Sequence, residues 1–224
     1  MPRYIDADYD AIRRALLEMG GVVEDMIERA GRALAEHDAE MARDVIRTDP
    51  KVDELEKQID ESCHEMLARQ QPMAADLRLL IAVLKITTDL ERIGDLASNM
   101  GRSVRDIASR PDLPEAKEIQ ALFDAARHMV AGALDAFMRS DAQLALEVWQ
   151  RDDAVDEGYK KFFEDLVSRT GKEPKAVEPY FQLLLIGRSL ERVADHATNI
   201  AEDVIYLVQG VDIRHTGRKD PVNA

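Results

Sequence analysis

Glycine, proline and aromatic residues are scarce in this sequence. It has 11 Gly and 8 Pro in 224 residues, and Phe, Trp and Tyr together make up 5%. Hydrophobic residues account for 46% and charged residues for 33%, with Ala, Leu, Glu, Asp and Arg prominent. This mixture favours α-helices over β-sheets.

Cysteine is nearly absent, because Cys63 is the only one in the sequence. A lone cysteine excludes a disulfide within the chain and indicates a reducing compartment. The first residues, from Met1 to Asp6, lack the apolar stretch of a signal peptide, and no apolar run is long enough to span a bilayer. We therefore expect a cytoplasmic protein that does not insert directly into a membrane.

Positive charge is in deficit. The 30 Lys and Arg residues face 44 Asp and Glu residues, which gives a formal net charge of -14 at pH 7. Binding to nucleic acid needs a basic surface that meets the phosphates, so the composition argues against a nucleic-acid partner. The acidic excess suits the binding of cations, or contact with basic surfaces of partner proteins.

The most informative feature is an internal repeat. The string LERIGDLASNM, from Leu90 to Met100, recurs one hundred positions later as LERVADHATNI, from Leu190 to Ile200. Six of its positions are identical and the others are mostly near-isosteric exchanges. A repeat of this kind indicates two copies of one structural unit.

The helical pattern predicts an all-α fold of two tandem antiparallel three-helix bundles, with six helices and a pseudo-twofold internal repeat. In the third and sixth helices, apolar residues alternate steps of three and four, the spacing of helix packing in bundles. We expect Asp38 to cap the second helix, Pro72 to mark the turn after it, and Gly20 and Gly21 to interrupt the first helix. The predicted domains are a first bundle at 1–109, a Pro-rich linker at 110–114, a second bundle at 115–210 and a loose tail at 211–224.

Acidic residues recur at matched positions in both halves. Glu91 and Asp95 lie one helical turn apart on the third helix, followed by Asn99, and all three are repeated as Glu191, Asp195 and Asn199. The middle helix of each half carries a second acidic pair, which is Asp49 with Asp53 in the first half and Asp152 with Asp156 in the second. In each hairpin the two pairs lie equally far from the turn, so antiparallel helices place them level with each other. We therefore expect four carboxylates to converge in each half.

Convergent carboxylates repel one another and raise one another's pKa unless a cation neutralises them. Clusters of oxygen ligands suit cations such as Mg²⁺, Mn²⁺, Ca²⁺ or Fe. We therefore hypothesise two metal sites on the helix surface. In the alternative interpretation the acids are solvated and paired with the repeated arginines, Arg92 and Arg192.

These motifs resemble the signature of the PhoU family, whose hallmark is a repeated E/D-x-x-x-D motif on paired three-helix bundles. The resemblance is carried by the string from Leu190 to Glu202, by its first copy and by the D-x-x-V-D pairs, and it covers nearly the whole chain. It implies a non-enzymatic negative regulator of the phosphate-starvation response, which couples the ATPase of the phosphate ABC transporter to a sensor histidine kinase through protein contacts. It also implies a homodimer.

The resemblance further implies metal clusters, because some members bind iron or zinc at the acidic motifs. Divalent or trivalent ions of Fe, Zn, Mn or Mg are the candidates. The ligands carried over to this chain are Asp49, Asp53, Glu91 and Asp95 at the first site, and Asp152, Asp156, Glu191 and Asp195 at the second. Residues expected around these ligands are Asn99, Asn199, Glu202, Arg92 and Arg192.

The two copies are not identical. Where the second copy has His196 and Glu202, the first has Leu96 and Arg102. A cation beside Arg102 would be bound more weakly, so we expect removal of carboxylates from the second site to lower metal affinity more. We place His196 around the site or at an interface rather than among the ligands, because it projects about 100° round the helix from Asp195.

Two other classes compete with a regulator. A carboxylate-metal enzyme or a metal-storage helical bundle would need a buried site with histidine ligands, and the five histidines are not spaced for one. A purely structural adaptor would use its acids only to remain in solution.

Overall fold

The structure, a computed structural model, describes residues 4–110, 117–172 and 177–213 and contains only helices within them. The helices are α1 (Tyr4–Ala35), α2 (Ala39–Gln70), α3 (Ala75–Ile107), α4 (Lys117–Arg139), α5 (Ala142–Trp149), α6 (Asp152–Thr170) and α7 (Val177–Gln209). The predicted all-α fold of paired antiparallel bundles is confirmed. None of these helices has a stretch apolar enough to cross a lipid bilayer.

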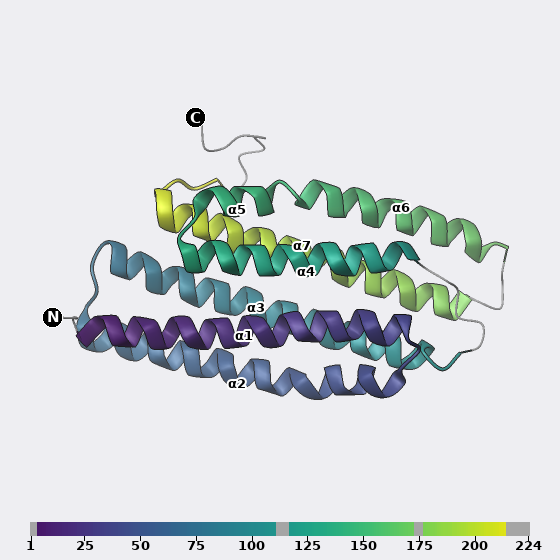
Figure 1. Ribbon diagram of the computed structural model, residues 1–224, viewed down its shortest axis with the longest axis horizontal. Coiled ribbons are helices and arrows are strands. Elements are labelled where there is room, and N and C mark those ends of the chain that lie inside the picture. The colour runs from purple at the N-terminus through teal and green to yellow at the C-terminus, as the bar shows by residue number, and fades with distance from the viewer. Residues whose placement is uncertain (1–3, 111–116, 173–176, 214–224) are drawn as a thin grey trace.

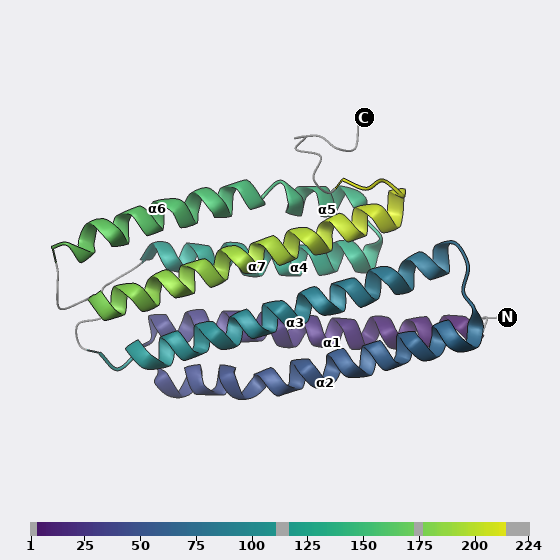
Figure 2. The same ribbon diagram turned by 180° about the vertical axis from the view of Figure 1, so that it is seen from behind.

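The two bundles lie side by side with their long axes aligned (Figure 1). Helices α1, α2 and α3 form one bundle, and α4 to α7 form the other. The longest contact between them is made by α3 and α7, which run antiparallel to each other (Figure 2), and α1 also packs on α4. Buried side chains of both bundles belong to one continuous hydrophobic core.

The regular apolar positions of α3 and α7 form the centre of this core. Leu90 and Ile93 on α3, and Leu190 and Val193 on α7, are fully buried. Burial of each such side chain contributes about 1.5–3 kcal/mol relative to leaving it in water. The same repeated string also contains the acidic residues. Burial of its apolar residues therefore fixes where the acidic residues lie along the helix axis, on the side away from these apolar residues.

The turns that open α2 and α5 are copies of each other. The Asp38 carboxylate accepts hydrogen bonds from the backbone N–H groups of Glu40 and Met41, both at 2.9 Å. The Asp141 carboxylate caps α5 in the same way. Such caps satisfy backbone donors that the first helical turn leaves unpaired, and the prediction for Asp38 is confirmed.

The first helix is not interrupted at its two glycines, so that prediction is wrong. Both glycines lie inside the continuous α1. A Cβ atom added to Gly20 would lie 2.3 Å from Cδ1 of Leu134 on α4, whereas one added to Gly21 would meet nothing within 4 Å. Gly20 therefore permits close packing between the bundles rather than ending the helix.

The fifth predicted helix is divided into α5 and α6 at Gln150 and Arg151. The Arg151 N–H bonds to the carbonyl of Val148, only three residues back, and the Arg151 carbonyl then accepts from Ala154 and Val155 of the next helix. The ladder of hydrogen bonds thus restarts, and Asp152 becomes the first residue of α6. The corresponding α2 continues across Pro50.

Some sequence predictions fall outside the described residues. Positions 111–114 of the predicted linker and 214–224 of the predicted tail are among them. Of that tail the structure describes 211–213, which are not helical, and Ile213 there is 2% exposed. The turn at Pro72 lies between α2 and α3, as predicted.

Candidate functional site

The first acidic cluster, formed by Asp49, Asp53, Glu91 and Asp95, joins α2 to α3. Burial raises the pKa of Asp49, and the charges of Asp95 and Asp53 raise it further. Burial likewise raises the pKa of Glu91, with added contributions from Asp95 and Asp53. The structure therefore brings the two acidic pairs together across the hairpin.

Arginines oppose the charge of the first cluster. Arg92 lies 3.3 Å from the Glu91 carboxylate and 3.6 Å from that of Asp95. Arg102 lies 3.9 Å from Asp49 and lowers its pKa, while its other amino group donates to the Asn99 side chain at 2.6 Å. Asn99 thus contacts an arginine rather than a carboxylate.

The second acidic cluster, formed by Asp152, Asp156, Glu191 and Asp195, joins α6 to α7. Burial, together with Asp156 and Asp195, raises the pKa of Asp152 from its ordinary value of 3.8 to about 6. Burial, Asp195 and Asp156 also raise the pKa of Glu191. In each half the predicted carboxylates thus lie close enough for their charges to raise the pKa of two members, which are Asp49 and Glu91 in the first and Asp152 and Glu191 in the second.

A hydroxyl group from the repeat accompanies each cluster. The Thr198 hydroxyl donates a hydrogen bond of 3.1 Å to Asp152, which lowers the pKa of that carboxyl against the stronger effect of burial. The equivalent Ser98 is fully buried beside Asp49 and also lowers its pKa, although its Oγ has no hydrogen-bond partner of regular geometry.

Three residues of the clusters were not predicted from the sequence. Glu56 lies near Glu91 in the first half, and burial with the charges of Asp60 and Asp53 raises its pKa. In the sequence, its spacing of three residues after Asp53 indicates that it lies on the same face of the helix.

The second cluster has two neighbours of this kind. Tyr159 lies near Glu191, and Arg188 pairs with Glu191 at 2.5 Å. Arg188 has no repeated counterpart, since position 88 is threonine.

Of the residues expected around the second cluster, Arg192 lies near one of its carboxylates, whereas Glu202 and Asn199 contact other residues. Arg192 lies near Asp195 and lowers its pKa. Glu202 accepts a hydrogen bond of 3.1 Å from Nε1 of Trp149, the last residue of α5. The Asn199 amide donates to Asp89 of the other bundle at 3.4 Å.

His196 lies at the interface between the bundles. Its Nδ1 lies 2.8 Å from the Asp89 carboxylate, and both side chains are largely buried. This agrees with its predicted interfacial position. Asp89 was not singled out in the sequence because position 189 is serine and the repeat does not mark it.

The carboxylates fit a hard cation by chemistry, since each cluster offers several carboxylate oxygens as ligands. One Glu191 oxygen is buried and has no hydrogen-bond partner. Within the described ranges, however, no three His, Cys, Asp or Glu side chains are arranged around a common point suitable for a metal ion. Arginines contact these carboxylates instead, so the metal sites stay a prediction.

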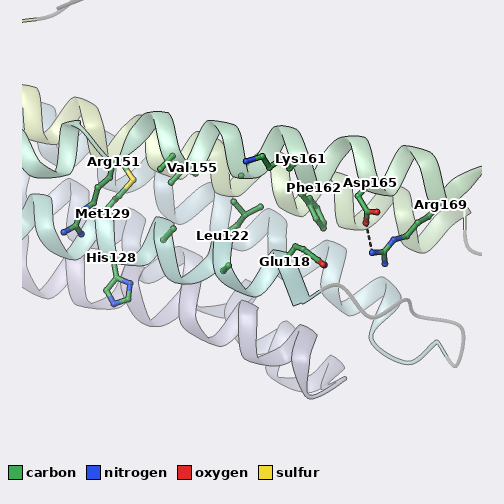
Figure 3. Close-up of a pocket in the computed structure, with 14 residues that line it drawn as sticks. Glu118, Leu122, His128, Met129, Arg151, Val155, Lys161, Phe162, Asp165 and Arg169 are labelled. Atoms are coloured by element: carbon green, nitrogen blue, oxygen red, sulfur yellow. Dashed lines mark ion pairs between the residues drawn. The ribbon is translucent and has the colours of Figure 1, made fainter. Parts of the chain in front are cut away.

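A separate groove of about 700 Å³ lies between α4 and α6 (Figure 3). Apolar side chains such as Leu122, Val155 and Phe162 line it, and Arg169 pairs with Asp165 at 2.7 Å on its border. None of the predicted site residues lines this groove.

The fold and the duplicated acidic motif define a class of tandem three-helix-bundle proteins with one carboxylate cluster per bundle. The family model of the PhoU domain matches the chain twice, at residues 16–104 and 119–204, and the chain belongs to the PhoU family.

Related proteins are similar over nearly the whole chain. A PhoU homolog of Pseudomonas aeruginosa, named phosphate-specific transport system accessory protein, is 43% identical over 95% of this chain and 88% of its own. The protein of that name from Escherichia coli K12 is 33% identical, with the same two coverages of 95% and 88%.

Solved structures share the fold. The crystal structure of PhoU from Pseudomonas aeruginosa matches with a TM-score of 0.89 at 42% identity, over 92% of this chain and 99% of that one. The phosphate transport system regulatory protein PhoU from Streptococcus pneumoniae matches with a TM-score of 0.86 at 27% identity, over 93% of this chain and 98% of that one.

Proposed function

We propose that this protein is a cytoplasmic accessory regulator of a phosphate-specific transport system. It holds the phosphate-starvation response off when phosphate is plentiful, and it does so by contacting the transporter ATPase and a sensor histidine kinase. The observation that carries this proposal is the match of two PhoU domains and of named accessory proteins over nearly the whole chain.

The surface of the protein supports action through protein contacts. Both long central helices expose large apolar side chains at equivalent positions near their N-terminal ends. Ile81 is 43% and Phe181 57% exposed, and Leu77 and Val177 are exposed in the same way. Exposed apolar side chains that recur at matched positions are suited to binding another protein.

The acidic clusters supply the second part of the proposal, in which metal ions bind at each cluster. Asp49, Asp53, Glu91 and Asp95 would hold one group of ions, and Asp152, Asp156, Glu191 and Asp195 the other. The ions would supply positive charge that offsets carboxylate repulsion. Arg92, Arg102 and Arg188, which now contact these carboxylates, would then exchange those partners for others.

The regulatory role is tested by deleting the gene and measuring alkaline phosphatase in phosphate-rich medium. We expect phosphatase expression to lose its repression, and a plasmid copy of the wild-type gene to restore it. Normal repression in the deletion strain would overturn the proposed role. The deletion strain is then complemented with the Glu191→Ala plus Asp195→Ala variant to test the second cluster. If this variant is stable but does not restore repression of phosphatase, the second cluster is required for signalling.

Contact with the transporter and the kinase needs its own measurement. Each purified partner, or its cytoplasmic part, is passed over immobilised protein, and the Phe181→Ser variant serves to test the exposed apolar positions. We expect saturable binding of both partners. Absence of binding to either, with folded protein on the surface, contradicts that part of the proposal.

A further inference from the structure

The interface between α3 and α7 has two ends that the internal repeat makes equivalent. A shift of one hundred positions carries residues of α3 onto residues of α7. Because the two helices run antiparallel (Figure 2), each position on α3 at one end of the interface corresponds to a position on α7 at the other end. The side chains at the two ends can therefore be compared position by position.

One end is closed by charged and polar pairs, which we call the polar clasp. Nζ of Lys85 lies 2.6 Å from the Asp203 carboxylate, which is only 10% exposed. The Asp89 carboxylate contacts both His196 and Asn199, as described above. These five side chains make polar contacts between the bundles at this end.

The other end has none of the residue types that make the charged pairs. The counterparts of the clasp residues are Leu185, Ser103, Ser189, Leu96 and Asn99. All five line a pocket of about 390 Å³ between α3 and α7. The shorter or uncharged side chains thus leave a pocket where the clasp would otherwise close the interface.

Three arginines line the same pocket, and we call it the arginine pocket. They are Arg102, Arg188 and Arg192, with Asp106 as the acidic residue of the lining. At the clasp end, the residue equivalent to Arg102 is Glu202 and the residue equivalent to Arg188 is Thr88. The end of the interface that lacks the clasp residues is therefore also the end that has additional arginines. This local positive charge occurs in a protein whose net charge is -14.

Two of these arginines contact carboxylates that do not line the pocket. Arg188 pairs with Glu191, and Arg102 lies 3.9 Å from Asp49. In the part of the chain that the structure describes, no carboxylate oxygen lies within 4.0 Å of the Arg192 guanidinium. Ser103, which is 8% exposed, adds a hydroxyl group to the lining.

We propose that the arginine pocket binds the phosphate group of a small molecule, either inorganic phosphate or a phosphate ester. Guanidinium groups bind phosphate oxygens through paired charge-assisted hydrogen bonds, and three arginines can contact several oxygens of one tetrahedral group. The volume of the pocket falls within the range of small-molecule sites. None of the eight carboxylates of the acidic clusters lines this pocket, although Arg102 and Arg188 also contact cluster residues. The site does not depend on the proposed function.

Calorimetric titration of chelator-treated protein tests the site without any metal. Inorganic phosphate and ATP are titrated separately, which distinguishes the two sources of the phosphate group. We expect saturable binding of at least one of them, and a loss of at least about tenfold in affinity in the Arg102→Gln plus Arg192→Gln variant. The control is Arg47→Gln plus Arg139→Gln, two exposed arginines on other helix surfaces, which should retain the wild-type affinity.

A second variant keeps every arginine. Ser189→Asp places a carboxylate at the position equivalent to Asp89, beside the arginines of the pocket, and should also weaken binding by at least about tenfold. Circular dichroism and thermal melting confirm that the variants fold. Absence of binding of both ligands to wild-type protein, or unchanged affinity in folded Ser189→Asp, overturns the proposal.

Discussion

Asp152 should reduce the stability of the protein when it is ionised. Its pKa is raised from 3.8 to about 6, chiefly by burial. The position at the start of α6 favours the charged form through the helix dipole, so burial and the neighbouring carboxylates outweigh that effect. At 1.36 kcal/mol per pH unit the difference corresponds to about 3 kcal/mol, and partial exposure to solvent reduces it to about 1–2 kcal/mol.

The sign of the effect follows from proton linkage. A carboxyl group whose pKa is raised by folding holds its proton more tightly in the folded state, so stability decreases as the pH rises from about 4 to about 6. Asp152→Asn removes this loss while its amide oxygen can still accept from Thr198. Metal-free Asp152→Asn should therefore be more stable than wild type at about pH 7.5, by about 1–2 kcal/mol, and nearly equal to it at about pH 3.5, below the ordinary pKa of the carboxyl group.

Urea unfolding and thermal melting at the two pH values measure the difference. For a chain of this size the gain corresponds to a rise of about 2–8 °C in Tm. The matched control is Glu164→Gln, which removes one exposed carboxylate from the same helix and should change stability little at either pH. If Asp152→Asn is less stable than wild type at neutral pH, or its gain is independent of pH, the assignment of strain to the acidic cluster is refuted.

Three further predictions concern packing and capping. Gly20→Ala should destabilise the folded protein by about 1–2 kcal/mol, because Leu134 must move within a buried interface. Gly21→Ala should instead stabilise it by about 0.5–1 kcal/mol. Urea unfolding compares the two variants, and equal effects would contradict the close contact at Gly20. Asp141→Ala should cost about 1 kcal/mol by the same measurement, through loss of the cap of α5, and an unchanged midpoint would oppose this. The buried Cys63 thiol, whose pKa burial raises to about 12, should react with a thiol reagent only after unfolding, and rapid reaction of native protein would count against it.

The sequence was sufficient to predict the helical architecture because the apolar repeat and the turn residues act locally. Asp38 caps its helix through the two residues that follow it. Equal distances from the turn at Pro72 also predicted that Asp53 lies near Glu91, and their electrostatic interaction agrees with this. In regular antiparallel helices, the number of residues from the turn determines the position along the bundle axis.

Contacts between the bundles could not be predicted from the sequence in the same way. Gly20 could be interpreted as a helix break or as a packing contact, and only the position of Leu134 on another helix distinguishes them. Asp89 and Arg188 fall outside the repeated string, yet they make contacts that differ between its two copies. The repeat indicated what the two halves share, whereas the differences between them depend on the docking of α3 against α7.

We propose that each repeated acidic cluster binds metal ions. The most direct measurement is the metal content of protein purified without chelator or metal-affinity resin, for wild type, Glu191→Ala plus Asp195→Ala, and Glu91→Ala plus Asp95→Ala. We predict metal in stoichiometric amounts in the wild type, with the larger loss of affinity in the second-site variant because Arg102 opposes charge at the first. Metal-free wild type that also binds no added Fe²⁺, Zn²⁺, Mn²⁺ or Mg²⁺ would contradict the claim.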